Sequence, residues 1–141
     1  MKRLLIIAIG MLFTAGLLAQ SKKAPAAGGA KPSAEKGKVV YSTYCLACHQ
    51  ADGAGVPNLN PPLIKTSWVM GDKTRLIKVL LNGLNEEVEI NGSTYSNPMP
   101  AHDFLSDEDI ANVLTYVRSS FTNKASAVTQ AEVKKLRNAK Q

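Results

Sequence analysis

The chain has 141 residues and a formal net charge of +6, which fits one ordinary domain of about 100 to 150 residues with short flanking segments. The charge is uneven, because residues 33–123 carry seven lysines and arginines against ten aspartates and glutamates, a net charge of −3. The positive charge therefore lies in the flanks. A nucleic-acid-binding domain carries its basic patch on the folded body, so the composition argues against nucleic acid as a partner.

Residues 1–19 have the pattern of an export signal. Lys2 and Arg3 precede an apolar run from Leu4 to Leu18, and Ala19 stands at a suitable cleavage position. The run is shorter than the roughly 20 apolar residues that span a bilayer. We therefore expect cleavage near Ala19 and a periplasmic protein, with an uncleaved membrane anchor as the alternative.

Two flanking segments lack the residues that build a core. Residues 20–32 are rich in Ala, Gly, Pro and Lys and predict a flexible linker, and residues 124–141 predict a basic tail. In this tail Thr129 and Glu132 can cap a short helix, which we expect to fray because it has no continuous apolar stripe. We expect the basic side chains of both flanks to act as loose electrostatic tethers to acidic membranes or partners: Lys22, Lys23, Lys31, Lys134, Lys135, Arg137 and Lys140.

Residues 33–123 predict a small all-α domain with one short β-hairpin. Ser33 can cap a first helix that runs into the cysteine pair. The prolines of residues 55–63 require an extended loop after it. Asp72 then precedes an apolar helical pattern over residues 73–82, which predicts a second helix.

Turn and capping signals divide the second half of this region. Gly83 ends the second helix, and Asn91-Gly92, within a stretch of alternating apolar and polar residues, is a strong hairpin signal. Ser106 and Asp109 have the spacing of a capping box. The helix that they open places apolar side chains on one face: Ile110, Val113, Leu114, Val117 and Phe121.

Cys45, Cys48 and His49 form the one cysteine motif of the chain. Thiols at positions i and i+3 project from one face of a helical turn, where they can add to the two vinyl groups of a porphyrin. His49 then lies beside the iron as an axial nitrogen ligand. A disulfide would close too small a loop to stabilise the fold, structural zinc would need four ligands, and a thiol redox site would need a βαβ context. The expected cofactor is one covalently attached haem c.

The motif CLACH, the loop GVPNLNPPL and the segment NPMPAHDFLSDEDIANVLTYVRSSF resemble the class I cytochromes c over residues 33–123. The resemblance implies a small helical domain around one haem, and the hairpin is similar to one in some bacterial members. It also implies that Gly37 and Tyr116 meet where the first and last helices cross. By the same resemblance, the carbonyl of Pro61 accepts the proton of the ligand histidine and Leu63 packs on the haem. The alternative for Pro61 is that it only shapes the loop.

Met99 is the strongest candidate for the sixth iron ligand. It lies between Pro98 and Pro100, which fix φ and keep the segment out of a helix. The resemblance places the distal methionine at this position as well. A thioether ligand favours ferrous iron and raises the reduction potential. His102 and Met70 are the alternative ligands.

Three other features carry two interpretations each. Trp68 can donate its indole N–H to a haem propionate or pack in the core. Asn97 can donate to the sulfur of Met99 or shape the following turn. The acidic clusters at residues 86–89 and 103–109 are either solvated faces or a docking surface for a basic partner.

These features predict an exported monohaem c-type cytochrome that shuttles single electrons and is not an enzyme. A six-coordinate iron leaves no position for a substrate. We expect a monomer whose partners are redox proteins, with a respiratory or dehydrogenase donor and an oxidase or other haem acceptor. The alternative is a haem-based gas sensor or peroxidase-like enzyme with an exchangeable sixth ligand, in which His102 would be the polar distal group. The Pro98-Met99-Pro100 sequence favours the shuttle.

Overall fold

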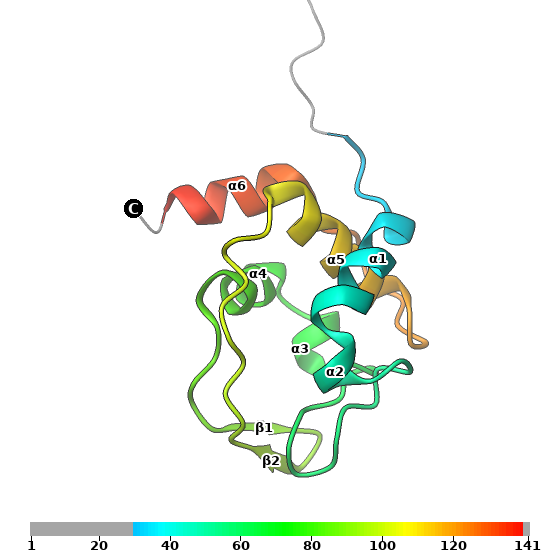
Figure 1. The fold of residues 1–141 in the computed structure, drawn as a ribbon, viewed down its shortest axis with the longest axis vertical. Coiled ribbons are helices and arrows are strands. Elements are labelled where there is room, and N and C mark those ends of the chain that lie inside the picture. The colour runs from blue at the N-terminus through cyan, green and yellow to red at the C-terminus, as the bar shows by residue number, and fades with distance from the viewer. Residues whose placement is uncertain (1–29, 140–141) are drawn as a thin grey trace, which may run out of the picture.

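The computed structural model describes residues 30–139. The expected export signal over residues 1–19, most of the expected linker and Lys140 lie outside the described residues. The part described is mostly helical, with one small antiparallel sheet (Figure 1). None of its helices is both long and apolar enough to cross a membrane. In chain order its elements are α1 (Ala34–Tyr44), α2 (Leu46–His49), α3 (Ser67–Met70), α4 (Lys73–Asn82), β1 (Val88–Ile90), β2 (Ser93–Tyr95), α5 (Asp107–Ser119) and α6 (Gln130–Asn138).

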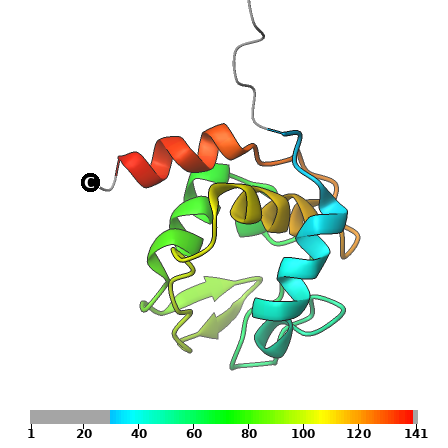
Figure 2. The same ribbon diagram turned by 45° about the horizontal axis from the view of Figure 1, so that its top comes forward.

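Helices α1 and α5 cross in close contact, as Figures 1 and 2 show. At the crossing Gly37 is buried, and a Cβ atom added to it would overlap the carbonyl of Asn112 and lie 2.8 Å from the Cβ of Tyr116. Only glycine fits such an approach of two backbones. The backbone N–H of Ser33 also donates to the side-chain oxygen of Asn112 at 2.7 Å. The expected meeting of Gly37 and Tyr116 is confirmed.

The predicted caps of α4 and α5 are confirmed. Asp72 accepts from the backbone N–H of Thr74 at 2.8 Å, and Gly83 follows the last residue of α4 with a φ of 73°. Ser106 accepts from the N–H of Asp109 at 3.1 Å. The Asp72 and Ser106 side chains satisfy N–H groups that have no partner inside a helix, so they fix where α4 and α5 begin.

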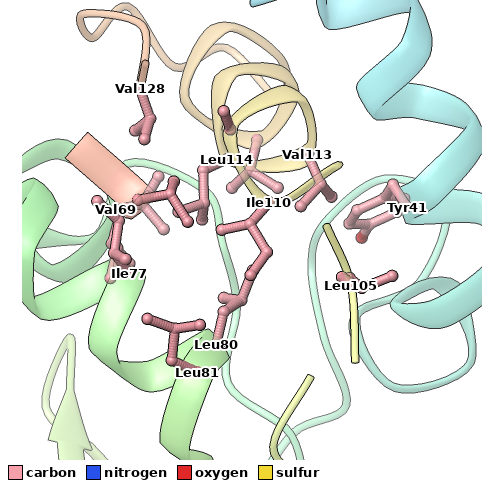
Figure 3. Close-up of a cluster of buried hydrophobic side chains, with 14 residues drawn as sticks. Tyr41, Val69, Ile77, Leu80, Leu81, Leu105, Ile110, Val113, Leu114 and Val128 are labelled. Carbon is pink, nitrogen blue, oxygen red and sulfur yellow. The ribbon is translucent and has the colours of Figure 1, made fainter. Parts of the chain in front are cut away.

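The core lies between α4 and α5. In Figure 3 side chains of the two helices point toward one another, with Val69 and Val128 beside them. The buried residues of α4 are Leu76, Ile77, Leu80 and Leu81, and the apolar ones of α5 are Ile110, Ala111, Val113, Leu114 and Val117. Burial of each large aliphatic side chain contributes roughly 1.5 to 3 kcal/mol to stability.

Phe121 does not lie on the apolar face of α5, where the sequence pattern placed it. The helix ends at Ser119, and Phe121 follows with a φ of 53°. Asn123 explains this early end, because its amide donates to the carbonyl of Val117 at 2.7 Å and thereby satisfies a helix-terminal acceptor. Phe121 instead packs against Tyr41 with ring centroids 5.3 Å apart.

The hairpin has the predicted form. Strand β1 pairs with β2 in antiparallel register, with Val88 opposite Tyr95 and Ile90 opposite Ser93. Asn91 and Gly92 occupy the turn with φ of 54° and 78°. Positive φ at both central residues is the requirement of the type I′ turn, which asparagine and glycine meet most easily.

The segment after residue 123 is packed on the domain, so the expectation of a fraying tail is wrong. Thr129 and Glu132 form a complete capping box at the start of α6. Val128 and Val133 are both fully buried, and α6 lies across α4 and α5 (Figure 2). The sequence pattern failed here because Val128 precedes the helix and Val133 lies within it, so the two make no stripe, although both are buried in one cluster with side chains of α4 and α5. Arg137, counted among the loose tethers, is bound to the carboxylate of Asp107 at 2.7 Å.

Candidate functional site

The cysteine motif forms a helical turn directly after α1. The backbone N–H of Cys45 donates to Tyr41 at 2.9 Å, and the N–H groups of Cys48 and His49 both donate to the carbonyl of Cys45, at 3.2 and 2.9 Å. Cys48 is exposed and Cys45 half-buried, and burial together with Cys48 raises the pKa of the Cys45 thiol to about 11. The turn thus presents both thiols and the imidazole within five consecutive residues, as the sequence predicted.

His49 is buried, and its Nδ1 atom lies 3.1 Å from the carbonyl oxygen of Pro61. The pKa of His49 is lowered, mainly by burial, with an opposing contribution from the Pro61 carbonyl and a lowering one from His102. A neutral imidazole that donates from Nδ1 keeps the lone pair on Nε2, which is the form that ligates a metal.

The loop that carries Pro61 is fixed by glycines and backbone hydrogen bonds. Gly55 donates to the carbonyl of His49 at 3.1 Å, and the N–H of Leu63 donates to Gly53 at 2.7 Å. Gly55 has a φ of 68°, and a Cβ atom there would lie 2.6 Å from the Pro61 oxygen. The loop therefore needs glycine at position 55 to bring the Pro61 carbonyl against the imidazole.

Met99 lies on another wall of the site, and its backbone is fixed by the end of α4. It forms an isolated antiparallel bridge with Leu84, with N–H to carbonyl distances of 2.8 and 2.9 Å. Pro98 and Pro100 have no N–H, so Met99 supplies the one donor of this three-residue stretch, and the bridge uses it. A Cβ atom on Gly83 would lie 2.6 Å from the carbonyl oxygen of Met99. The end of α4 is thus packed directly on the backbone of Met99.

Both walls face one apolar cavity, and an enclosed, mostly apolar cavity with a few polar groups is the usual form of a cofactor or ligand site. Its surface consists almost entirely of apolar atoms. It is lined by Tyr41, Cys45, His49, Pro61, Pro62, Leu63, Thr66, Trp68, Val69, Leu76, Val79, Leu80, Leu84, Ile90, Met99, His102, Leu105, Val113, Leu114 and Val117. An adjoining hollow shares His49 and Met99 and is lined by Cys48.

The residues present fit a haem. A flat apolar macrocycle needs an apolar enclosure, and an iron at its centre needs nitrogen or sulfur donors from the walls. The cavity provides an imidazole at His49 and a thioether at Met99, with the thiol of Cys45 on its surface. This donor set suits iron in a porphyrin better than it suits a hard, oxygen-binding cation.

The other candidate residues have separate positions. Leu63 and Trp68 line the cavity, and the guanidinium of Arg75 lies 4.3 Å from the centre of the Trp68 ring. Met70 is half-buried at the end of α3 and does not belong to the described residues that line the cavity. The side-chain N–H of Asn97 donates to Asn60 at 2.7 Å, rather than to the sulfur of Met99.

His102 lies three residues after Met99 and lines the same cavity. It is buried, its backbone N–H donates to Leu80 at 2.6 Å, and its Nδ1 lies 2.9 Å from the carbonyl of Pro100. The structure therefore brings the favoured sixth ligand and its histidine alternative to one wall of the site.

Sequence reasoning missed two residues that hold the site in place. Leu84 pairs with Met99, and the β-hairpin lies between them in the chain. The one local feature that pointed to Leu84 was the end of the preceding helix at Gly83. Arg118 is buried and donates to the carbonyls of Val69, at 2.5 Å, and Ser126, at 2.7 Å. It connects the cavity wall at α3 to the segment before α6, and a single arginine in the last turn of a helix carries no signal of this role.

Comparisons with known proteins agree with this geometry. The family model for cytochrome c matches residues 34–121. A cytochrome c-552 of Thermus thermophilus is 34% identical over 119 residues, which cover 78% of this chain and 80% of the relative. The cytochrome c subunit of an alcohol dehydrogenase (quinone) from Gluconacetobacter polyoxogenes is 35% identical over 105 residues, covering 72% of this chain and 22% of the subunit. The chain belongs to the cytochrome c family, whose cofactor is covalently bound haem c.

Proposed function

We propose that this cytochrome c is an exported monohaem carrier that takes single electrons from a dehydrogenase or respiratory donor and delivers them to an oxidase or other haem acceptor. One observation carries the proposal: His49 and Met99 line the same apolar cavity, with the cysteine pair at its edge. Two axial donors from the protein leave no coordination position for a substrate, which favours a carrier over an enzyme.

Each residue of the motif has a definite role in this proposal. Cys45 and Cys48 would attach the haem through thioether bonds, and Nε2 of His49 and the sulfur of Met99 would ligate its iron. The haem supplies an iron that alternates between ferric and ferrous states. In the neutral ring, His49 Nδ1–H donates to the backbone carbonyl of Pro61, which fixes the orientation of the ring and its tautomer.

The walls of the cavity keep the iron ligands and the exclusion of water the same in both oxidation states. The two backbone hydrogen bonds between Met99 and Leu84 hold the thioether donor in one place, so the same ligand serves both oxidation states. Leu63 packs on the porphyrin and excludes water, which keeps small molecules from the iron. Trp68, held under Arg75, is placed at the cavity surface to donate its indole N–H to a propionate.

The partners are proposed from chemistry and from relatives. A similar segment makes up 22% of the cytochrome c subunit of an alcohol dehydrogenase (quinone) and 24% of that of a gluconate 2-dehydrogenase from Pantoea cypripedii, which supports a dehydrogenase as donor. Glu86, Glu87 and Glu89 are exposed and form an acidic surface for a basic partner. The exposed Lys31, Lys134 and Lys135 remain as tethers to an acidic membrane surface.

Absorption spectra of the holoprotein with and without carbon monoxide test the proposal. The ferric wild type should show the weak red band of sulfur-ligated haem, and the ferrous wild type should resist carbon monoxide. Met99→Ala should abolish the band and admit carbon monoxide, whereas His102→Ala, the matched change on the same wall, should leave both properties intact. Rapid carbon monoxide binding by the wild type, or sensitivity to His102→Ala alone, would favour the sensor or peroxidase-like alternative.

A further inference from the structure

Arg137, in the last turn of α6, contacts the segment that joins Met99 to α5. Its Nη1 and Nη2 atoms donate to the carbonyls of Asp103 and Leu105, and its Nε donates to the carboxylate of Asp107, each at 2.7 Å. The guanidinium is only 27% exposed and Asp107 only 19%. All three nitrogens of one guanidinium are therefore used on three acceptors within residues 103–107, the last of which is the first residue of α5. This is the fork geometry that arginine alone provides.

This segment also has attachments that do not involve Arg137. Between Met99 and α5, the backbone N–H of His102 donates to Leu80 at 2.6 Å and that of Leu105 donates to His102 at 3.1 Å. Leu105 is buried and lines the haem cavity, whereas Asp103 and Phe104 are exposed. Arg137 holds the carbonyls on both sides of the exposed Phe104. The other contacts at the end of the segment nearest α5 are the buried side chain of Leu105 and the ring of Phe104, which lies 5.4 Å from the ring of Tyr44 in α1.

We propose that Arg137 is a positioning residue for the sixth ligand. Met99 leaves the iron when its segment moves away from the cavity, and three attachments oppose that movement: the bridge to Leu84, the hydrogen bond from His102 to Leu80, and the guanidinium of Arg137 beyond them. Releasing the Arg137 contacts lowers the free energy of this local opening. Helix α6 thus sets how long the thioether stays bound, and the inference rests on the proposed role of Met99.

A merely structural role for Arg137 makes a different prediction, and the chain offers a matched control. Lys73 forms the other ion pair between α6 and the body, with its Nζ 3.1 Å from Glu132. The side chain of Lys73 is 26% exposed, close to the 27% of Arg137, while its partner Glu132 at 39% is more exposed than Asp107 at 19%. Lys73 lies on α4 and does not contact the segment after Met99. Loss of either pair loosens α6, but only loss of Arg137 frees the methionine segment.

Imidazole binding to the ferric holoprotein tests the proposal, because imidazole occupies the iron only after the thioether has left. Arg137→Gln should bind imidazole roughly tenfold faster than the wild type, since it removes charge-assisted hydrogen bonds to backbone groups. Lys73→Gln should bind at nearly the wild-type rate, at a temperature where both variants are fully folded. Arg137→Lys should restore only part of the protection, because a lysine cannot reach all three acceptors. Equal rates for Arg137→Gln and Lys73→Gln, or full rescue by lysine, would overturn the proposal.

Hydrogen exchange separates this test from failure of the proposed ligand. If Met99 is not the sixth ligand, Met99→Ala will leave imidazole binding as fast as in the wild type. The amide of Leu105 should still exchange faster in Arg137→Gln than in Lys73→Gln if Arg137 holds the segment. Equal exchange of that amide in the two variants would show that Arg137 does not position the segment, whatever ligates the iron.

Discussion

The Nδ1 atom of His49 lies 3.1 Å from the carbonyl oxygen of Pro61, which comes twelve residues later in the chain. The contact depends on Gly55, whose φ of 68° and missing Cβ allow the loop to close against that carbonyl. The position of one backbone oxygen beside the ligand histidine is therefore set by a glycine that contacts neither the imidazole nor the cavity.

Gly55→Ala should displace the Pro61 carbonyl and weaken its hydrogen bond to the imidazole. A weaker bond makes the imidazole less basic, which stabilises ferric iron less and raises the reduction potential. A redox titration of the holoprotein measures this shift. Gly92→Ala is the matched control, since Gly92 also has a positive φ, of 78°, but no atom lies within 4 Å of the added Cβ.

Both substitutions carry a similar positive-φ penalty of roughly 1 to 2 kcal/mol. Gly55→Ala adds the overlap with the loop backbone, so its melting temperature should fall further than that of Gly92→Ala, and it alone should shift the potential. An unchanged potential in Gly55→Ala, or an equal shift in Gly92→Ala, would show that the Pro61 contact does not tune the iron.

Val133→Ala should destabilise the protein by about 2 kcal/mol, because Val133 is fully buried and the substitution leaves a cavity between α6 and the body. Val39→Ala makes the same chemical change on α1, where Val39 is 68% exposed, and should change stability by less than about 0.5 kcal/mol. Chemical denaturation of the two holoproteins, followed by circular dichroism, compares them. Equal midpoints would mean that α6 does not contribute to the folded domain.

Local signals account for what the sequence predicted correctly. The cysteine motif, the caps at Asp72 and Ser106, and the Asn91-Gly92 turn each lie within a few residues of the structure they specify. Their physical basis is short-range, since a cap or a turn is decided by neighbouring backbone groups. These signals were enough to predict an all-α fold with one hairpin.

The contacts that the sequence did not reveal are long-range. The bridge between Leu84 and Met99 joins two loops, and Arg118 binds carbonyls of segments far away in the chain. The expectation for α6 was wrong for the same reason. The burial of Val133 depends on its packing with residues of α4 and α5 rather than on a pattern within α6 itself. Periodicity reports the face of one helix and says nothing about which surface will receive it.

Gly83→Ala should loosen the wall that carries the proposed sixth ligand. Gly83 ends α4 with a φ of 73°, and an added Cβ would lie 2.6 Å from the carbonyl oxygen of Met99 and 2.9 Å from the N–H nitrogen of Ala101. Both neighbours are backbone atoms, so a side-chain rotation cannot relieve the overlap. The backbone at Met99 must therefore move away from α4, which lengthens the two hydrogen bonds between Met99 and Leu84.

Gly83→Ala and Gly55→Ala should change different properties of the haem. Gly83→Ala should weaken the red sulfur-to-iron band of the ferric protein and let carbon monoxide bind the ferrous protein, because the thioether is displaced. Gly55→Ala should keep the band and shift only the potential, because it acts on the histidine wall. Gly92→Ala again controls for backbone strain and should leave both properties unchanged.

The penalty for positive φ is common to all three variants. Any difference between them must therefore arise from the atoms that each new Cβ meets: the Asn60 and Pro61 carbonyls, the Met99 carbonyl or open space. A full red band in Gly83→Ala, with no carbon monoxide binding, would mean that the end of α4 does not hold Met99 in place.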